Sequence, residues 1–554
     1  MLRGIAAYRG MVGMGVQELR VVVKTDASED EVEQIVASVV SPAITAAPTA
    51  ATTPTVPGFR LERLFVEDPS QYLVVTQSTA AVGTPEYAQQ AHTLAQLLFE
   101  TGRFTWAEAD VPVRAYERPG VTPDGVGAFA GVPDPPGSDK TWARKSIRCA
   151  QAWELPPPPG GRSRGEGIRV GHPDTGYSDH PGLGLDALDL TTDRDMISND
   201  DDALDPLVPP NQSPWPQPNP GHGTSTGSVI VGQGDEQQGV VGVAPRAKLV
   251  PVRAIESVVQ LFDSDVARAV EHARRVGCHV VSMSLGGTGF RGLYEQIRRA
   301  VDGGMIVMAA AGNRVGIVTA PASYDNCVAV TAVGVGDRRW PESSRGSAVD
   351  ISAPGWAVHV AGFDWTISPP GRKVGPSSGT SYAVAHLAGV AALWLAFWGH
   401  GTIVAKYGAP RVQAVFMHLV KTVGRRVPPN WDTDWGVGVV DAEALLRTAL
   451  PDPDDVPEGA GAFGGGDDPI QRLSAFLGEA DPDVLRQALE QRFGATGPEL
   501  DELLRRFEGE LADLAVEDDV FRESLLTAGA PGAFDTGPTV PGAASPHLRA
   551  VLAG

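Results

Sequence analysis

The chain has 554 residues, 42% of them hydrophobic, and a formal net charge of −22, which allows about three domains of roughly 100–200 residues each. The negative charge argues against nucleic acid as a partner, because phosphate binding needs a basic surface, and no unbroken apolar run reaches the ~18 residues that span a bilayer. Three cysteines, Cys149, Cys278 and Cys327, are too few and too scattered for a disulfide framework or a zinc site. Without a signal-peptide pattern, these features predict a cytoplasmic protein that binds no nucleic acid and no membrane.

Residues 16–117 predict a small α/β domain. Strand patterns alternate with two amphipathic helices, of which the first follows a capping box of Ser28 and Glu31 and the second begins at Pro85. The resulting order of elements, β-α-β-β-α-β, is that of a ferredoxin-like fold. A linker rich in Pro and Gly follows over 118–138.

Residues 139–450 predict a larger α/β domain. Strand-like runs that are apolar along their whole length, such as "MIVMAAAG", alternate with helical patterns such as "SDVARAVEHARRVG". Strands that are apolar on both faces and joined by crossover helices indicate a doubly wound, mostly parallel sheet. A linker over 451–468 leads to an acidic helical domain over 469–527 and a disordered tail over 528–554. The acidic helices suit either an interaction module that binds a protein partner or a passive stabilising appendage, and the sequence leaves both open.

Three polar residues of the larger domain, Asp174, His222 and Ser381, lie at the end of a predicted strand or the start of a predicted helix. In an open parallel sheet, functional sites assemble at the carboxyl ends of the strands. Each residue also has a structural interpretation: a turn-capping Asp, a structural His, and a small residue before the buried helix in "GTSYAVAHLAG". His172 and His180 flank Asp174, but they give only a weak indication of a metal site.

These three residue types, together with Asn313 after the strand in "MIVMAAAGN", are those that acyl transfer requires. A Ser hydroxyl is a weak nucleophile until a His removes its proton, and a buried Asp fixes the His tautomer and offsets the imidazolium charge. An Asn side chain or a pair of backbone N–H groups must then stabilise the oxyanion. The set predicts nucleophilic catalysis on an acyl substrate.

From about residue 139 to 450 the sequence resembles the subtilisin-type serine proteases, or subtilases. Nine motifs occur in the order of that family: "DTG", "HGT", "GVVGVAPRAKLVPVRA", "SMSLGG", "AAAGN", "PASY", "ISAPG", "GTSYA" and "GVGVVDAEAL". The resemblance implies protein or peptide substrates, with Asp174 as the orienting acid, His222 as the general base and Ser381 as the nucleophile. It also implies an oxyanion hole made of the Asn313 side chain and the Ser381 backbone N–H.

The resemblance further implies how substrate binds. An edge strand that lies against extended substrate is expected at Ser284, Leu285, Gly286 and Gly287. Arg314 is expected at the rim of the pocket for the residue before the scissile bond. Because little of the sequence up to "PASY" can shield its charge, we expect acidic side chains to be tolerated there. Where the family usually has Pro, four residues after the nucleophile, this chain has Ala385, which keeps a helix feasible.

By the same resemblance, residues 16–117 are expected to be a prodomain whose last strand covers the substrate cleft, and a maturation cut is expected within 118–138. No cofactor is expected for catalysis. A structural calcium ion is a candidate, because many subtilases bind one and the acidic run "NDDDALD" over 199–205 precedes the His. A solvated acidic loop is the favoured interpretation of that run.

Three functions are compatible with the sequence. The first is an intracellular serine endopeptidase restrained by its N-terminal domain. The second is a dedicated processing protease or transpeptidase that acts on one cognate peptide. The third, a non-catalytic binding scaffold, is disfavoured because Asp174, His222, Ser381 and Asn313 are all present.

Overall fold

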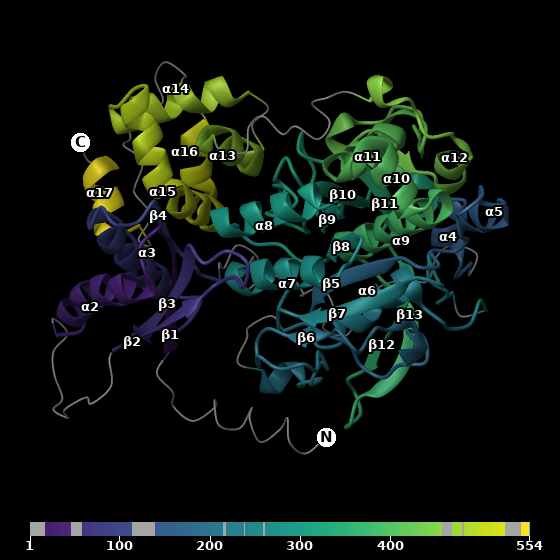
Figure 1. Cartoon of the computed structure of the whole chain (residues 1–554), viewed down its shortest axis with the longest axis horizontal. Coiled ribbons are helices and arrows are strands. Elements are labelled where there is room, and N and C mark those ends of the chain that lie inside the picture. The colour runs from purple at the N-terminus through teal and green to yellow at the C-terminus, as the bar shows by residue number, and fades with distance from the viewer. Residues whose placement is uncertain are drawn as a thin grey trace.

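The computed structural model describes residues 17–45, 58–112, 139–213, 218–237, 239–258, 261–456, 468–478, 481–526 and 544–552. The predicted linker at 118–138 lies outside the described residues, as do most of the linker at 451–468 and most of the tail at 528–554. Three parts follow one another along the chain: an N-terminal α/β part, a central part with a large sheet, and a set of C-terminal helices (Figure 1).

The N-terminal part is a four-stranded antiparallel sheet with two helices. Its elements are β1 (Gln17–Lys24), α2 (Glu29–Thr45), β2 (Phe59–Arg63), β3 (Gln71–Ser78), α3 (Pro85–Glu100) and β4 (Trp106–Ala109). The strands lie in the order β2-β3-β1-β4. The predicted capping box is present ahead of α2, where the Ser28 N–H donates to Glu31 Oε2 at 3.0 Å.

The central part is built on a nine-stranded sheet in the order β14-β15-β11-β10-β9-β8-β5-β7-β6. Its strands are β5 (Arg169–Asp174), β6 (Arg194–Asp195), β7 (Lys248–Arg253), β8 (Val280–Met283), β9 (Ile306–Ala310), β10 (Val328–Val333), β11 (Ile351–Pro354), β14 (Arg425–Arg426) and β15 (Val439–Val440). Every neighbouring pair is parallel except β14 with β15. The mostly parallel sheet predicted from the sequence is therefore present.

Helices surround this sheet, some packed directly on its strands and others on neighbouring helices (Figure 1). They are α4 (Trp142–Ser146), α5 (Cys149–Glu154), α6 (His222–Val231), α7 (Asp263–Arg275), α8 (Arg291–Asp302), α9 (Thr380–Trp398), α10 (His400–Tyr407), α11 (Val412–Thr422) and α12 (Ala442–Arg447). A β-hairpin of β12 (Val358–Asp364) and β13 (Gly371–Ser377) leads into α9. Among the described residues, α9 is the one helix long and apolar enough to cross a membrane, but it is completely buried. Its apolar composition is that of a helix at the centre of a protein core.

Successive residues of the central strands alternate between two hydrophobic cores, because side chains of a strand point to opposite faces of the sheet. Along β9, Ile306 and Met308 belong to a first core that also contains residues of α6 and α9. Val307 and Ala309 belong to a second core that contains residues of α7 and α8. Both faces are buried, which accounts for the continuous apolar runs in the sequence.

The C-terminal part consists of α13 (Pro469–Leu477), α14 (Pro482–Phe493), α15 (Pro498–Glu517), α16 (Asp519–Leu526) and α17 (Pro546–Leu552). The first four helices lie where the sequence predicts helices. The prediction of disorder is wrong for α17, because Leu548 is fully buried and the Glu510 carboxylate accepts hydrogen bonds from the N–H and hydroxyl of Ser545. A buried leucine and a polar contact with a distant helix hold this short helix, and composition does not reveal either of them.

Candidate active site

Asp174, His222 and Ser381 lie where the parallel strands end. Asp174 is the last residue of β5, His222 is the first residue of α6, and Ser381 is the second residue of α9. α6 packs against both α9 and β5, so the three element ends are held near one another. All three side chains are buried.

Asp174 and His222 form a hydrogen-bonded pair. Nδ1 of His222 lies 2.8 Å from Oδ1 of Asp174, and this oxygen also accepts the Thr175 N–H at 2.7 Å. Burial alone would raise the pKa of Asp174, but the charge and hydrogen bond of His222 and the nearby His172 hold that pKa below its ordinary value. The carboxylate therefore stays ionised beside the imidazole, where it can fix the Nδ1–H tautomer and offset an imidazolium charge.

Glycines allow α6 to approach the loop that follows β5. A Cβ at Gly223 would lie 2.1 Å from the Gly176 carbonyl oxygen, so a larger residue does not fit there. Gly221, which precedes His222, has a φ of 82°, a conformation that glycine adopts without steric cost. The glycines of the "DTG" and "HGT" motifs thus have a steric role in bringing the Asp and the His together.

Ser381 lies in the first turn of α9, next to a residue whose ring is close to His222. The ring of the next residue, Tyr382, has its centroid 6.5 Å from that of His222. Ser284, which follows β8, holds the backbone of the serine: Ser284 Oγ donates to the Ser381 carbonyl oxygen at 3.0 Å, and Ser381 Oγ donates to the Ser284 carbonyl oxygen at 3.4 Å. α9 continues without a break through the fully buried Ala385, so alanine at this position is compatible with a regular helix.

Asn313 follows β9 and is oriented by α9. Its Oδ1 accepts the N–H and the hydroxyl of Thr380, both at 2.9 Å. A Cβ built at Gly379 would lie 3.8 Å from Asn313 Nδ2 and 3.7 Å from the Ser381 backbone nitrogen. Two N–H donors therefore border the same space beside Ser381, which is the arrangement that stabilises an oxyanion.

The segment expected to be an edge strand for substrate is not open. Leu285 is buried, the Gly286 N–H donates to the Val258 carbonyl oxygen at 3.1 Å, and Gly287 exchanges two backbone hydrogen bonds with Ala320. The Gly286 N–H can pair with an extended substrate only after it has left Val258. The sequence pattern could not show this closure, because both partners come from distant segments.

The prediction that Arg314 carries an unshielded charge is wrong. Its Nε donates to the Glu342 carboxylate at 2.8 Å, and its backbone N–H donates to the Glu342 carbonyl oxygen at 2.6 Å. A bridge between Asn313 and Ser343 brings this distant segment alongside. Because the ion pair neutralises the guanidinium, Arg314 gives no reason to expect acidic side chains before the scissile bond.

His172 and Thr226 lie against the second carboxylate oxygen of Asp174. Thr226 Oγ1 is 3.2 Å from Asp174 Oδ2 and 3.0 Å from His172 Nε2. Burial lowers the pKa of His172, and the opposing charge of Asp174 does not restore that pKa to its ordinary value. His172 was considered only as a weak metal candidate and Thr226 was missed, although the spacing of both residues could have indicated them. His172 shares a strand face with Asp174 two residues later, and Thr226 shares a helix face with His222 four residues earlier.

Among the described residues, no group of three or more His, Cys, Asp or Glu side chains is arranged to hold a metal ion. His180, the other histidine near the Asp in sequence, instead binds the backbone. Its Nδ1 accepts the Gly182 N–H at 2.9 Å, and its Nε2 lies 3.1 Å from the Lys373 carbonyl oxygen. The two histidines beside the "DTG" motif therefore have separate surroundings.

The acidic run at 199–205 has an exposed portion and a buried end. Residues 200–202 are exposed, as expected for a solvated loop, but Asp205 is buried. Asp205 Oδ2 accepts from Thr175 Oγ1 and from the Gly221 N–H, both at 2.7 Å. These two residues are the sequence neighbours of the paired Asp and His. The solvated-loop interpretation is therefore wrong for Asp205, which holds the two segments of the pair together.

A buried Asp–His pair, a serine in the first turn of a neighbouring helix and two N–H donors, all on a parallel sheet, are together typical of a serine hydrolase. The family model described as "Subtilase family" matches residues 165–438. Thermitase from Thermoactinomyces vulgaris is 32% identical over 264 residues, which are 47% of this chain and 84% of that protein. Subtilisin Savinase from Lederbergia lenta is 34% identical over 285 residues, which are 51% of this chain and 92% of that protein.

The chain therefore belongs to the subtilase family and is a serine endopeptidase, which confirms the resemblance seen in the sequence. A solved structure of a protease from Pseudoalteromonas arctica covers 57% of this chain and 98% of its own, at 28% identity and a TM-score of 0.46. The central part of the chain is called the catalytic domain below.

Proposed function

We propose that the chain hydrolyses peptide bonds with Asp174, His222 and Ser381 as its catalytic triad. The observation that carries the proposal is the 2.8 Å hydrogen bond between Asp174 and His222 beside the first turn of α9. His222 takes the proton of the Ser381 hydroxyl as its oxygen attacks the scissile carbonyl, and later gives that proton to the leaving amine. Asp174 stabilises the imidazolium, while Asn313 Nδ2 and the Ser381 N–H donate to the oxyanion.

A fluorophosphonate probe tests this assignment directly, because it labels only an activated serine. We expect the unaltered chain, once its N-terminal domain has been released, to be labelled and to hydrolyse peptides, and the Ser381→Ala and His222→Ala chains treated in the same way to do neither while remaining folded. Hydrolysis falls by about 10⁶-fold when such a triad loses one of these members, a magnitude known from this family. Turnover retained in a clean Ser381→Ala preparation would refute the mechanism.

A dedicated processing protease or transpeptidase is the second candidate, and the hydrogen bond between Gly286 and Val258 favours it. A substrate that pairs with Gly286 must displace this bond, which selects for peptides with other favourable contacts. Product analysis on a peptide library separates the candidates. Many cleaved peptides indicate a general endopeptidase, one or a few indicate a processing enzyme, and ligated products indicate a transpeptidase.

We also propose that residues 16–117 form a ferredoxin-like prodomain that restrains the enzyme. The element order and the strand order β2-β3-β1-β4 support this assignment. The last strand, β4, and the residue after it lie at the starts of two catalytic-domain helices. Glu108 of β4 accepts the Arg291 N–H at 2.9 Å, and Asp110 accepts the Ser264 N–H at 3.3 Å and the Ser264 hydroxyl at 2.5 Å. These hydrogen bonds tie the end of the N-terminal domain to the starts of both helices, so they favour a docked domain.

In this proposal, a cut within 118–138 ends the covalent restraint. Tethering gives the N-terminal domain a millimolar effective concentration at its docking surface, so modest intrinsic affinity suffices before the cut. The unaltered chain should cut itself there, whereas Ser381→Ala should stay at full length. If uncut chain is as active as chain that begins near residue 139, the N-terminal domain is not a restraint.

The cytoplasmic location stays a prediction. Its support in the structure is that Cys149, Cys278 and Cys327 are buried thiols with no disulfide between them. Burial raises the pKa of Cys149 and of Cys278 to about 12, which keeps both thiols protonated and unreactive. Localisation of a tagged chain in its own cells tests the prediction.

A further inference from the structure

The C-terminal helices contact the N-terminal domain as well as the catalytic domain. α15 packs against β4 and α3, and α17 packs against α3. Figure 1 shows these helices, in yellow-green and yellow, directly beside the N-terminal sheet. The N-terminal domain is thus held by two surfaces of the same chain: the helices of the catalytic domain and the C-terminal helices.

Polar contacts join α3 to the C-terminal helices. Gln96 Nε2 donates to the Arg506 carbonyl oxygen at 3.0 Å, and Arg506 Nε donates back to Gln96 Oε1 at 2.6 Å. Gln89 Nε2 donates to the Ala544 carbonyl oxygen at 3.0 Å, and the Arg506 guanidinium pairs with Glu100. Because the Gln96–Arg506 contact is reciprocal, it fixes how α3 and α15 lie against each other.

A buried ion pair lies in the same interface. His92 Nε2 of α3 is 2.9 Å from Asp513 Oδ2 of α15, and the two side chains are 5% and 9% exposed. Burial alone would lower the pKa of His92, but the hydrogen bond to Asp513 and the negative charges of Glu510 and Glu517 raise it. Removing one partner of such a pair leaves the other charge buried and unpaired, which is strongly destabilising.

Four charged side chains join all three parts of the protein. Arg291 of the catalytic domain pairs with Glu108 of β4 at 3.1 Å and with Glu508 of α15 at 3.2 Å. Arg472 of α13 donates through Nε to the same Glu508 at 2.7 Å. The two positive and two negative charges balance, and each side chain is at most 14% exposed. This cluster is complete only when all three parts are in place.

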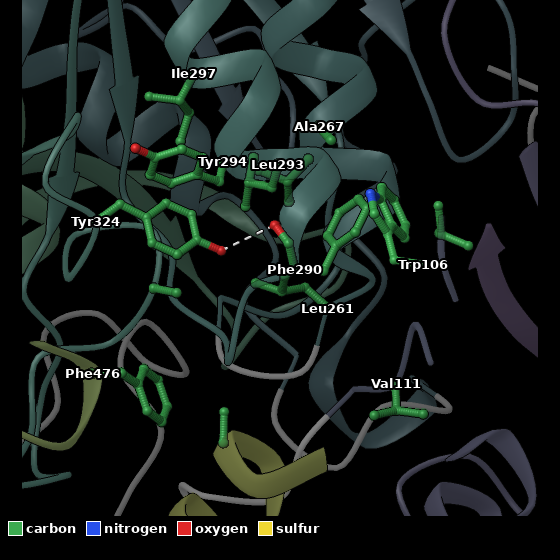
Figure 2. Packing of buried hydrophobic residues seen from close by; sticks show 14 of the residues in the cluster. Trp106, Val111, Leu261, Ala267, Phe290, Leu293, Tyr294, Ile297, Tyr324 and Phe476 are labelled. Atoms are coloured by element: carbon green, nitrogen blue, oxygen red, sulfur yellow. Dashed lines mark hydrogen bonds between the residues drawn. The ribbon is translucent and has the colours of Figure 1, made fainter. Parts of the chain in front are cut away.

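Apolar side chains from the three parts also meet in one cluster (Figure 2). Trp106 and Val111 come from the N-terminal domain, Phe290 and Tyr324 from the catalytic domain, and Phe476 from α13. The three parts therefore share a continuous hydrophobic core, and separating any one of them exposes apolar surface of the others to water.

We propose that the C-terminal helices are a clamp that keeps the N-terminal domain docked after the linker has been cut. Cutting removes the tether and its effective concentration, but it leaves every contact of the clamp intact. Cleavage within 118–138 then does not release the enzyme by itself, and release requires the clamp to open. The inference rests on the proposed restraint by the N-terminal domain.

The test uses the full chain with Ser381→Ala and a recognition site for a specific protease inserted within 118–138. After cleavage at that site, size-exclusion chromatography shows whether the N-terminal fragment stays bound to the remainder of the chain. Immobilising that remainder on a surface then gives the dissociation rate of the fragment. We expect the fragment to stay bound when the C-terminal helices are unaltered. It should dissociate at least ~10-fold faster from the chain that also carries Arg506→Ala and Asp513→Asn. Arg506→Ala alone, at a partly exposed position, should give a smaller increase.

Arg505→Ala is the matched control, because Arg505 is the adjacent residue of α15 and its side chain pairs with Glu502 on the same helix. It should leave the dissociation rate unchanged, and the melting temperature of each uncut chain shows whether the variant is folded. Equal dissociation rates in all variants, or immediate loss of the fragment from the unaltered clamp, would overturn the proposal. Because retention is measured in a chain without its nucleophile, the result is independent of whether the triad and the restraint are correctly assigned.

Discussion

Thr226 Oγ1 lies 3.2 Å from Oδ2 of Asp174, the carboxylate oxygen that does not face His222, and 3.1 Å from the His222 carbonyl oxygen, so its hydroxyl can donate to either. A hydrogen bond to one oxygen withdraws negative charge from the other, so Thr226 and the adjacent His172 modulate how strongly Asp174 stabilises an imidazolium. Neither residue touches the reacting atoms, and both are positioning residues for the pair.

Replacing Thr226 by Val should move the acid limb of the kcat/KM profile to higher pH. The isosteric change removes the hydroxyl, so the Asp174 carboxylate becomes more basic and holds a protonated base more strongly. We expect a shift of about half a pH unit, equivalent to ~0.7 kcal/mol. Thr224→Val is the control on the same helix, because the Thr224 hydroxyl accepts the Ser178 N–H at 2.8 Å instead. Superimposable profiles for Thr226→Val and the unaltered enzyme would contradict this role.

Asp205→Asn should destabilise the protein and reduce kcat. Asp205 accepts hydrogen bonds from Thr175 Oγ1, the Gly221 N–H and the Leu207 N–H. An amide has one acceptor oxygen and would turn its NH₂ group toward a donor, at a cost of about 1–3 kcal/mol. Denaturant unfolding and initial rates measure both effects, and Asp202→Asn in the exposed part of the same run should change neither. A fully active Asp205→Asn enzyme would show that the two loops need no such link.

Asn313→Asp should lower kcat by about 10²–10³-fold with little change in KM. The substitution keeps an oxygen that accepts the two Thr380 donors, at 2.9 Å each in the structure. It replaces the NH₂ group by a carboxylate oxygen, which cannot donate to the oxyanion and adds a negative charge beside it. Steady-state kinetics on a small peptide substrate measure the effect. A raised KM with normal kcat would instead indicate that Asn313 binds the ground state.

Docking of the N-terminal domain should weaken as pH rises through about 6. Burial raises the pKa of Asp110 to about 6 against the opposing effect of Arg20, and burial together with Asp110 raises the pKa of Asp263 well above its ordinary value. A carboxyl group with a raised pKa binds its proton more tightly in the docked state, so docking is favoured below about pH 6 and loses this contribution above it. The dissociation rate of the cut Ser381→Ala chain should rise by at least ~10-fold between about pH 5 and pH 7.5.

Asp110→Asn separates this effect from that of His92. The amide cannot ionise but still accepts from Ser264, so the rate should depend less on pH in the range around 6. The raised pKa of His92 acts with the same sign at higher pH, because the ion pair with Asp513 is lost as pH rises through that pKa. A pH dependence that is identical in Asp110→Asn would assign the whole effect to His92 or to other groups.

Local patterns were sufficient to place the ends of the elements that form the site. The apolar run of β5 stops at Asp174, which therefore ends a strand. A run of small residues follows Gly221, so His222 starts a helix. The alternation of strands and helices was equally predictable from local patterns. Neighbouring residues such as Val307 and Met308 are buried on opposite faces of the sheet, so the strand is an unbroken apolar run in the sequence.

Local patterns could not predict contacts between segments that are distant in the sequence. Glu342, which neutralises Arg314, is 28 positions away in the sequence. Asp205 accepts hydrogen bonds from Thr175 and Gly221, although the acidic run to which it belongs has the composition of a solvated loop. The burial of Leu548 likewise depends on helices made far earlier in the chain. Each of these depends on tertiary packing, whereas composition and periodicity report only neighbours in sequence.

The second hydrophobic core extends from Leu19 of β1 to Leu548 of α17. A ribosome makes β1 first and α17 last, so the N-terminal domain leaves the exit tunnel long before the helices that complete its surroundings. Packing of this core cannot finish until synthesis has passed Leu548. The face of the catalytic sheet that contains Val307 and Ala309 is therefore completed only after both the N-terminal domain and the C-terminal helices have been synthesised.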